Sequence, residues 1–94
     1  GTEYTNSLTR CIIVVAYGYP AQSGGWHFQD ISGLIGASSA NIEVVRVQRH
    51  DSQTTVVYYS SITFVVPPSY KWKVLNSALE GNTGTISRIE AFSL

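Results

Sequence analysis

The sequence contains a single cysteine and no methionine, and charged residues make up only 13% of its 94 residues. One cysteine cannot form a disulfide within the chain, which excludes the disulfide frameworks of small secreted domains. Cys11 lies in an apolar run, where a thiol behaves as a small hydrophobic side chain, so a packing role is favoured over a reactive one. A domain of this size without disulfides has a marginal core, and oligomerisation is one remedy.

An excess of charge of either sign is also absent, because six Lys and Arg residues balance six Asp and Glu residues. No basic stretch is present that would attract nucleic acid or an anionic membrane. The longest apolar run, residues 11–17, is too short to cross a bilayer, and the chain opens on polar residues rather than on a signal peptide. We therefore expect no nucleic-acid partner and no membrane insertion.

Catalytic and metal-binding motifs are equally scarce. The two histidines, His27 and His50, are 23 residues apart with no cysteine or carboxylate at metal-ligand spacing. The sequence has no G-x-S-x-G nucleophile motif and no glycine-rich phosphate loop, and nothing in it requires two carboxylates to face each other across a cleft. We expect a protein that is not an enzyme and uses no metal or cofactor, with both histidines on the surface or in loops.

What the sequence does contain favours an all-β fold. Apolar residues make up 44% of the chain, and Val, Ile and Thr are abundant, which favours extended backbone. Short apolar or alternating runs are separated by turn residues, a pattern typical of a small antiparallel β-sandwich, jelly-roll-like, with about seven strands. We expect the chain to form a single domain over residues 1–94. The expected strands cover residues 10–18, 26–31, 41–50, 54–60, 61–66, 70–74 and 85–94.

The segments between these runs carry turn chemistry. Residues 19–25 and 32–40 read as Gly- and Ser-rich connections, and Asp51-Ser52 as a tight hairpin turn. Residues 67–68 are prolines, which mark a strand end, and residues 76–84 form a loop in which 77–80 can make one helical turn. The run at 10–18 is continuously apolar, which predicts a strand covered on both faces.

In two of these runs, the positions of the apolar residues predict further structural detail. In residues 41–50 the apolar alternation slips by one position, which predicts a β-bulge near Val44 or Val45. In the last run, positions 86, 88, 90, 92 and 94 are expected on one face, ending on apolar Phe92 and Leu94. An apolar end of this kind is more stable when it is buried against a neighbouring chain.

The candidate binding residues lie in two polar and aromatic clusters, since loops on a rigid β-scaffold often carry binding residues and aromatic rings stack on sugars. The first cluster comprises Tyr17, Tyr19, Gln22, Trp26 and His27. The second comprises Arg49, His50, Asp51 and Gln53. The alternative interpretations are that Tyr17 and Trp26 are core residues and that the second cluster is a solvated turn. At least one of the neighbouring tyrosines at 58 and 59 points away from the core.

Three blocks of the sequence carry a resemblance. They are Thr2 to Val14 (TEYTNSLTRCIIV), Ser60 to Val74 (SSITFVVPPSYKWKV) and Gly84 to Leu94 (GTISRIEAFSL). Together they resemble the C-terminal receptor-binding (knob) domain of tail fibre proteins from tailed bacteriophages. Ser69 stands where that family usually has glycine, Trp72 stands where a smaller residue is usual, and residues 19–40 do not align with it.

The resemblance implies a homotrimeric knob at the distal end of a fibre, on the virion and outside the cell, with residues 1–94 as the C-terminal part of a longer fibre protein. It implies binding to a bacterial surface receptor, either a polysaccharide or an outer-membrane protein, during host adsorption. Two alternatives stay open. One is a structural cap that trimerises the fibre without touching the host, and the other is a monomeric or dimeric lectin unrelated to phage.

Overall fold

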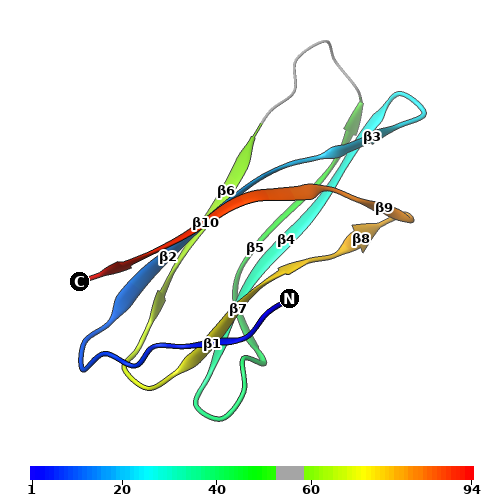
Figure 1. The fold of residues 1–94 in the computed structure, drawn as a ribbon. Helices are drawn as coiled ribbons and strands as arrows, with labels where there is room; N and C mark the ends of the chain where they lie inside the picture. Colours follow the sequence, from blue (N-terminus) through cyan, green and yellow to red (C-terminus); the bar gives the residue numbers. More distant parts are fainter. Residues whose placement is uncertain (53–58) are drawn as a thin grey trace.

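The computed structural model describes residues 1–52 and 59–94, and these form strands and no helix. The described part of the chain therefore holds no helix that could span a membrane. The molecule is elongated, with extents of 46 × 21 × 16 Å (Figure 1). The strands are β1 (Tyr4–Thr5), β2 (Ile12–Tyr19), β3 (Ala21–Ser23), β4 (Trp26–Gly36), β5 (Ile42–Ser52), β6 (Ser60–Val66), β7 (Lys71–Asn76), β8 (Ala78–Leu79), β9 (Asn82–Thr83) and β10 (Thr85–Ser93).

Two antiparallel sheets make up the fold (Figure 1). In the larger sheet, β4 pairs with β5 along nearly its whole length, and on its other side with β3 and then with β7, which carries β1. The smaller sheet has the order β10-β2-β6, and β8 and β9 form a separate short hairpin. The prediction of a small antiparallel β-sandwich is confirmed.

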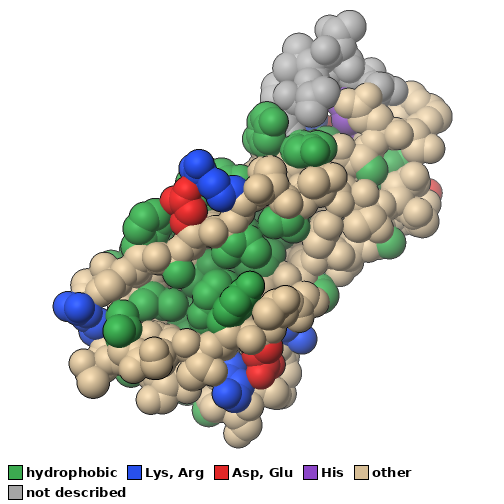
Figure 2. Space-filling view, viewed as in Figure 1, with side chains coloured by type: hydrophobic (Ala, Val, Ile, Leu, Met, Phe, Trp, Pro, Cys, Tyr) green, Lys and Arg blue, Asp and Glu red, His purple; other side chains and the backbone are tan. Residues whose placement is uncertain are grey.

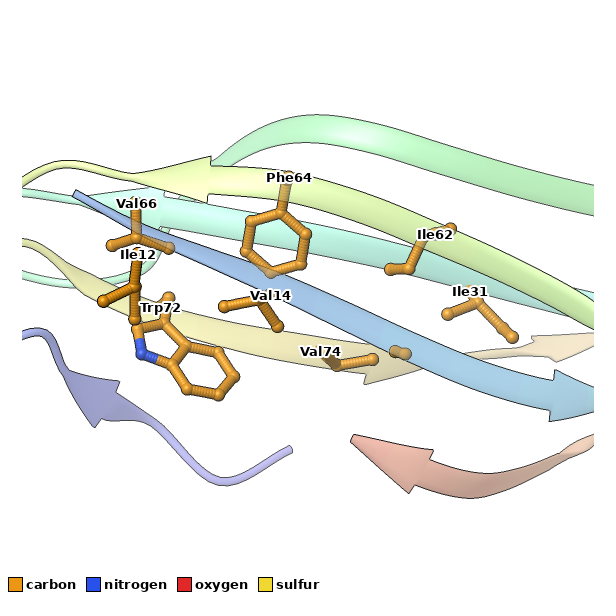
Figure 3. Close-up of a cluster of buried hydrophobic side chains, with 9 residues drawn as sticks. Ile12, Val14, Ile31, Ile62, Phe64, Val66, Trp72 and Val74 are labelled. Carbon is orange, nitrogen blue, oxygen red and sulfur yellow. The ribbon is translucent and has the colours of Figure 1, made fainter. Parts of the chain in front are cut away.

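The core lies between the two sheets and follows the period-two alternation of the strands. On β2 and β6 every second side chain is buried, and these meet Trp72 and Val74 of β7 and Ile31 of β4 (Figure 3). The buried members on β2 and β6 are Ile12, Val14, Ala16, Ile62, Phe64 and Val66. The prediction that β2 is covered on both faces is wrong, because its other face looks away from the sandwich and is only half-buried.

The bulge predicted near Val44 or Val45 is confirmed. Gly33 of β4 lies opposite Val45, whereas Leu34 lies opposite Glu43, so Val44 is the extra residue. Gly33 also lies under the Phe64 ring, because a Cβ at that position would come within 2.5 Å of two ring carbons. The absence of a side chain at Gly33 therefore permits the two sheets to approach closely at this point.

Several predicted connections are strands instead. Residues 32–36 continue β4, and Asp51 and Ser52 are the last residues of β5 rather than a turn. Residues 19–25 hold β3 and a two-residue turn at Gly24 and Gly25, whose φ angles of 59° and 83° suit a hairpin. Cross-strand pairing outweighs the local turn propensity in each case. The strand predicted over residues 54–60 lies largely outside the described residues.

The last third of the chain departs from the prediction in two further places. Residues 78–83 form the β8–β9 hairpin around Glu80 and Gly81, both at positive φ, instead of a helical turn. In β10 a register shift lies between Ile86 and Arg88. Ile86 therefore packs against the core while Arg88 lies on the opposite face, so the five alternate positions do not share one face.

The N-terminal segment is held by one buried amide. The side chain of Asn6 donates from Nδ2 to the carbonyl oxygens of Arg10, Val66 and Pro67, at 2.9 to 3.2 Å. Its Oδ1 accepts a hydrogen bond from the backbone N–H of Leu8. Asn6 therefore joins the first ten residues to the end of β6, and the side chain is 2% exposed.

Candidate functional site

The candidate residues gather at one end of the sandwich. We call this the hairpin end, which comprises the β3–β4 turn, the last residues of β5 and the last residues of β2 (Figure 1). The register places Gln22 opposite His27, His27 opposite Asp51, and Phe28 opposite His50. Two segments far apart in the sequence, residues 17–27 and 49–52, therefore meet at this end. Gln53 lies outside the described residues.

The side chains at this end nevertheless point to different faces. Ile31, Val45 and Val47 pack toward the core, so the odd positions of β4 and of the β5 segment beyond the bulge face the smaller sheet. The even positions form the outer face of the larger sheet. The candidates on β4 and β5 thus divide into an outer aromatic group and an inner polar group.

The outer group is a strip of stacked rings, which we call the aromatic strip and which consists of Trp26, His50 and Phe28. The Trp26 and His50 ring centroids are 5.2 Å apart, and the His50 and Phe28 centroids are 5.0 Å apart with an interplanar angle of 24°. Phe28 is buried beneath its neighbours, whereas Trp26 is 45% exposed. The core interpretation of Trp26 is therefore wrong, and its indole face is open to a ligand.

Beside the strip, on the same face, lies a fixed ion pair that the sequence did not reveal. Arg46 donates to both carboxylate oxygens of Asp30, from Nε at 2.9 Å and from Nη2 at 2.7 Å. The hydrogen bond from Arg46 lowers the pKa of Asp30 below its ordinary value of 3.8, and Gln48 adds a weaker contact. The pairing uses two of the five N–H donors of the guanidinium, which lies at the surface.

This ion pair predicts a specific acid response. Because the pKa of Asp30 is lower in the folded chain, the pair stabilises the fold above pH 3.8 and loses that contribution as the pH falls through the lowered value. Asp30→Asn removes the titrating group and Arg46→Gln removes the main cause that lowers its pKa, so we expect both variants to flatten the fall in the urea midpoint below pH 4. The check is urea unfolding followed by tryptophan fluorescence between pH 2 and 7. Unchanged acid profiles in both variants would contradict it.

The inner group is a buried polar row. His27 Nδ1 lies 3.2 Å from Asp51 Oδ1, and Arg49 Nε donates to Asp51 Oδ2 at 2.9 Å. The hydrogen bond from Arg49 is the main cause that lowers the pKa of Asp51, and His27 lowers it further. The expectation of a surface or loop histidine is wrong for His27, whose side chain is fully buried on β4. His27 is therefore unable to contact a receptor directly, and its effect is to orient Asp51, which is half-exposed.

Polar atoms without partners accompany this row. Nε2 of His27, both amide atoms of Gln29 and Oδ1 of Asn76 are buried without a hydrogen-bond partner among the described residues. Buried polar groups are usually satisfied, and these make the interior at this end more polar than the apolar middle of the sandwich. The candidate site is thus built on a polar rather than an apolar support.

Tyr17 and Tyr19 belong to the opposite side of the sandwich, on the outer face of the smaller sheet. The Tyr19 ring meets the Tyr59 ring edge-on at 5.6 Å, and the Arg88 guanidinium lies 5.0 Å from the Tyr17 ring centre. Tyr59 is 69% exposed, which agrees with the prediction that one of the tyrosines at 58 and 59 points outward. Gln22 lies on β3 and is exposed. The candidate residues thus form one end of the molecule but not one surface.

A third feature lies away from the hairpin end. A groove of about 370 Å³ runs between the N-terminal segment and β10, lined by polar residues of both and by apolar side chains that include Leu8, Ile12 and Trp72. Figure 2 shows hydrophobic side chains gathered in a hollow on this face. Phe92 of β10 points away from this groove, to the outer face of the smaller sheet, because it lies opposite Ile13. It is 51% exposed, and Leu94 is 60% exposed. We call the groove and this exposed end of β10 together the open side.

Neither a cluster of metal ligands among the described residues nor a similarity to known proteins indicates a function. Within residues 1–52 and 59–94, no three His, Cys, Asp or Glu side chains lie close enough together to hold a metal ion. Comparisons with protein-family models, with curated proteins and with solved structures find no match for this chain. The function is therefore argued from the surfaces described above and from the sequence resemblance.

Proposed function

We propose that this chain is the receptor-binding tip of a tailed-bacteriophage tail fibre and that it contacts the bacterial surface through its hairpin end. The observation that carries the proposal is the aromatic strip with the ion pair of Arg46 and Asp30 beside it. An open indole face at the end of a rigid β-scaffold offers a large contact area at a low entropic cost. The role is one of binding rather than catalysis.

The chemistry of this surface fits a bacterial polysaccharide better than an outer-membrane protein. The apolar face of a sugar ring stacks on an exposed indole, and its hydroxyl groups take hydrogen bonds from guanidinium, amide and carboxylate groups. Trp26 supplies the ring, and Arg46, Gln48 and Asp30 supply hydrogen-bonding groups on the same strand pair. A strip that runs along the outer face of a sheet suits an extended glycan chain. An outer-membrane protein remains the second receptor class.

The assembly that accompanies this function is a homotrimer on the virion. The apolar open side, with Phe92 and Leu94 exposed, supports burial against neighbouring copies. The groove lies near the start of β2 and the end of β10, away from the hairpin end, so trimerisation leaves the aromatic strip accessible. Three linked copies would convert weak single sites into strong binding, because the linked sites raise the effective concentration.

The test separates binding from assembly with two substitutions. Trp26→Ala removes the exposed indole and is expected to weaken binding of fluorescently labelled chain to host cells by about tenfold or more, without a change in solution mass. Phe92→Ala on β10 is expected to lower the trimer fraction. Flow cytometry measures the binding, and light scattering coupled to size exclusion measures the mass.

The alternatives predict different results from the same two measurements. A structural cap predicts that Trp26→Ala leaves adsorption intact while Phe92→Ala abolishes assembly. A free lectin predicts sugar binding by a species with the mass of one or two chains. A wild-type chain that binds no bacterial surface at all would contradict the proposed function.

A further inference from the structure

A small concave site on the smaller sheet is not used by the function proposed above. It measures about 340 Å³ and is lined by Tyr17, Tyr59, Ser87 and Arg88, which we call the tyrosine pocket. Two strands and one residue outside them contribute, because Tyr17 lies on β2, the residues at 87 and 88 lie on β10, and Tyr59 directly precedes β6. Of these residues, Tyr17 is a binding candidate predicted from the sequence.

The bulge in β10 creates the polar wall of this pocket. The register of β10 against β2 shifts between Ile86 and Arg88, and this shift places Arg88 opposite Tyr17. The hydroxyl of Ser87 donates to the carbonyl oxygen of Tyr17 at 3.2 Å, which fixes the extra residue at the pocket edge. Bulges commonly re-aim side chains beside binding sites. Without this one, Ser87 and Arg88 would exchange faces.

The groups around the pocket are polar but electrically balanced. The Arg88 guanidinium lies 5.0 Å from the Tyr17 ring centre and makes an ion pair with Glu90 through Nε. Glu90 lies two residues along the same face of β10, opposite Val15. The pair offers both N–H donors and carboxylate acceptors with no net charge, which disfavours a charged ligand and favours a hydroxylated one.

We propose that the tyrosine pocket binds one neutral pyranose ring. The Arg88 guanidinium lies over the Tyr17 ring, so the exposed ring of Tyr59 provides the apolar face against which the C–H groups of a sugar can stack. The Arg88 and Glu90 pair and the Ser87 hydroxyl oxygen provide donors and acceptors at the rim for sugar hydroxyl groups. The inference deepens the polysaccharide form of the proposed function and rests on it, since a glycan chain would then contact both sheets of the sandwich.

The pocket and the aromatic strip are separable by mutation, because they lie on the outer faces of opposite sheets. Arg88→Gln removes the positive charge and the planar set of guanidinium N–H donors at an exposed position, where a substitution is expected to change the stability of the fold little. Arg10→Gln makes the same chemical change at an exposed residue outside the pocket. Trp26→Ala removes the strip and leaves the pocket intact.

The experiment is a ¹H–¹⁵N NMR titration of the chain with the methyl α-pyranosides of glucose, galactose and mannose, and with methyl glucuronide as the charged probe. We expect at least one neutral glycoside to shift the amide signals of Tyr17, Tyr59, Ser87 and Arg88 with a millimolar dissociation constant. Arg88→Gln is expected to weaken this binding about tenfold, and Arg10→Gln and Trp26→Ala to leave it within about twofold.

Each other outcome overturns the inference in a recognisable way. Shifts confined to Trp26, His50 and Arg46 would support binding at the proposed receptor site and would rule out sugar binding at the tyrosine pocket. Tighter binding of the glucuronide than of the neutral sugars would overturn the ligand class. If no probe shifts any signal, the proposed sugar binding at the tyrosine pocket is wrong, while cell binding through the aromatic strip is unaffected. If the pocket binds sugar but the chain attaches to no bacterium, the proposed function is wrong and the pocket inference stands.

Discussion

Asn6→Asp is expected to lower the free energy of unfolding by about 3 kcal/mol or more, because it buries a charge without a partner. The amide Nδ2 of Asn6 faces three carbonyl oxygens, and the side chain is 2% exposed. A carboxylate of the same shape would oppose those oxygens and lose both amide donors. We therefore expect the thermal midpoint at pH 7 to fall by more than about 10 °C.

A pH series distinguishes this cause from a general loss of packing. Protonation restores one O–H donor to the introduced carboxyl, so the deficit relative to wild type is expected to be smaller at pH 4 than at pH 7. Asn41→Asp is the matched control, since Asn41 is exposed and the same change there should cost less than about 0.5 kcal/mol. Equal losses at both positions, or a deficit that does not vary with pH, would contradict the account.

Gly33→Ala is expected to cost about 2 kcal/mol, because the new Cβ would lie within 2.5 Å of the Phe64 ring. Phe64 is buried and is part of the core cluster, so its ring can move only by displacing neighbours. Urea unfolding of the variant at pH 7 measures the loss. An alanine that leaves stability unchanged would show that the two sheets can separate at this point without cost.

A double-mutant cycle locates the clash. Phe64→Leu alone removes ring volume and should destabilise the core. If the clash is the cause, Gly33→Ala should cost much less in the Phe64→Leu background, with a coupling of about 1 kcal/mol or more. Additive losses would instead place the cost in the backbone of β4 beside the bulge.

The strands could be predicted from the sequence wherever the alternation was strict. Residues 70–74 alternate apolar and polar side chains, residues 61–66 do so except at Val65, and the bulge at Val44 followed from a phase slip alone. The predictions failed where local propensity and pairing disagree. Residues 32–36 contain two glycines and a serine, yet the β5 and β7 neighbours hold them in β4. Asp51 and Ser52 have the composition of a turn, but their pairing with β4 extends β5 to Ser52. These two residues alone do not indicate that pairing.

The candidate site was predicted in part for a similar reason. Aromatic and polar residues near turns indicated two clusters, and these lie at one end of the molecule because neighbouring strands share their ends. The face that each side chain occupies depends on the register of the strands. The composition of the segment therefore could not show that His27 is buried and Trp26 is exposed. Arg46, Asp30 and Arg88 were missed because each acquires its partner only through cross-strand pairing or through a bulge. The signal that could have found Arg88 is its alternation with Glu90 in the last strand.

The binding of labelled wild-type and Trp26→Ala chains to a panel of bacterial strains, side by side, tests the central claim most directly. The account predicts that the wild-type chain binds some strains and not others, that surface polysaccharide extracted from a bound strain competes for the binding, and that Trp26→Ala loses at least about tenfold in affinity on those strains. Equal binding by both chains, or no binding to any strain by a properly folded wild-type chain, would contradict it.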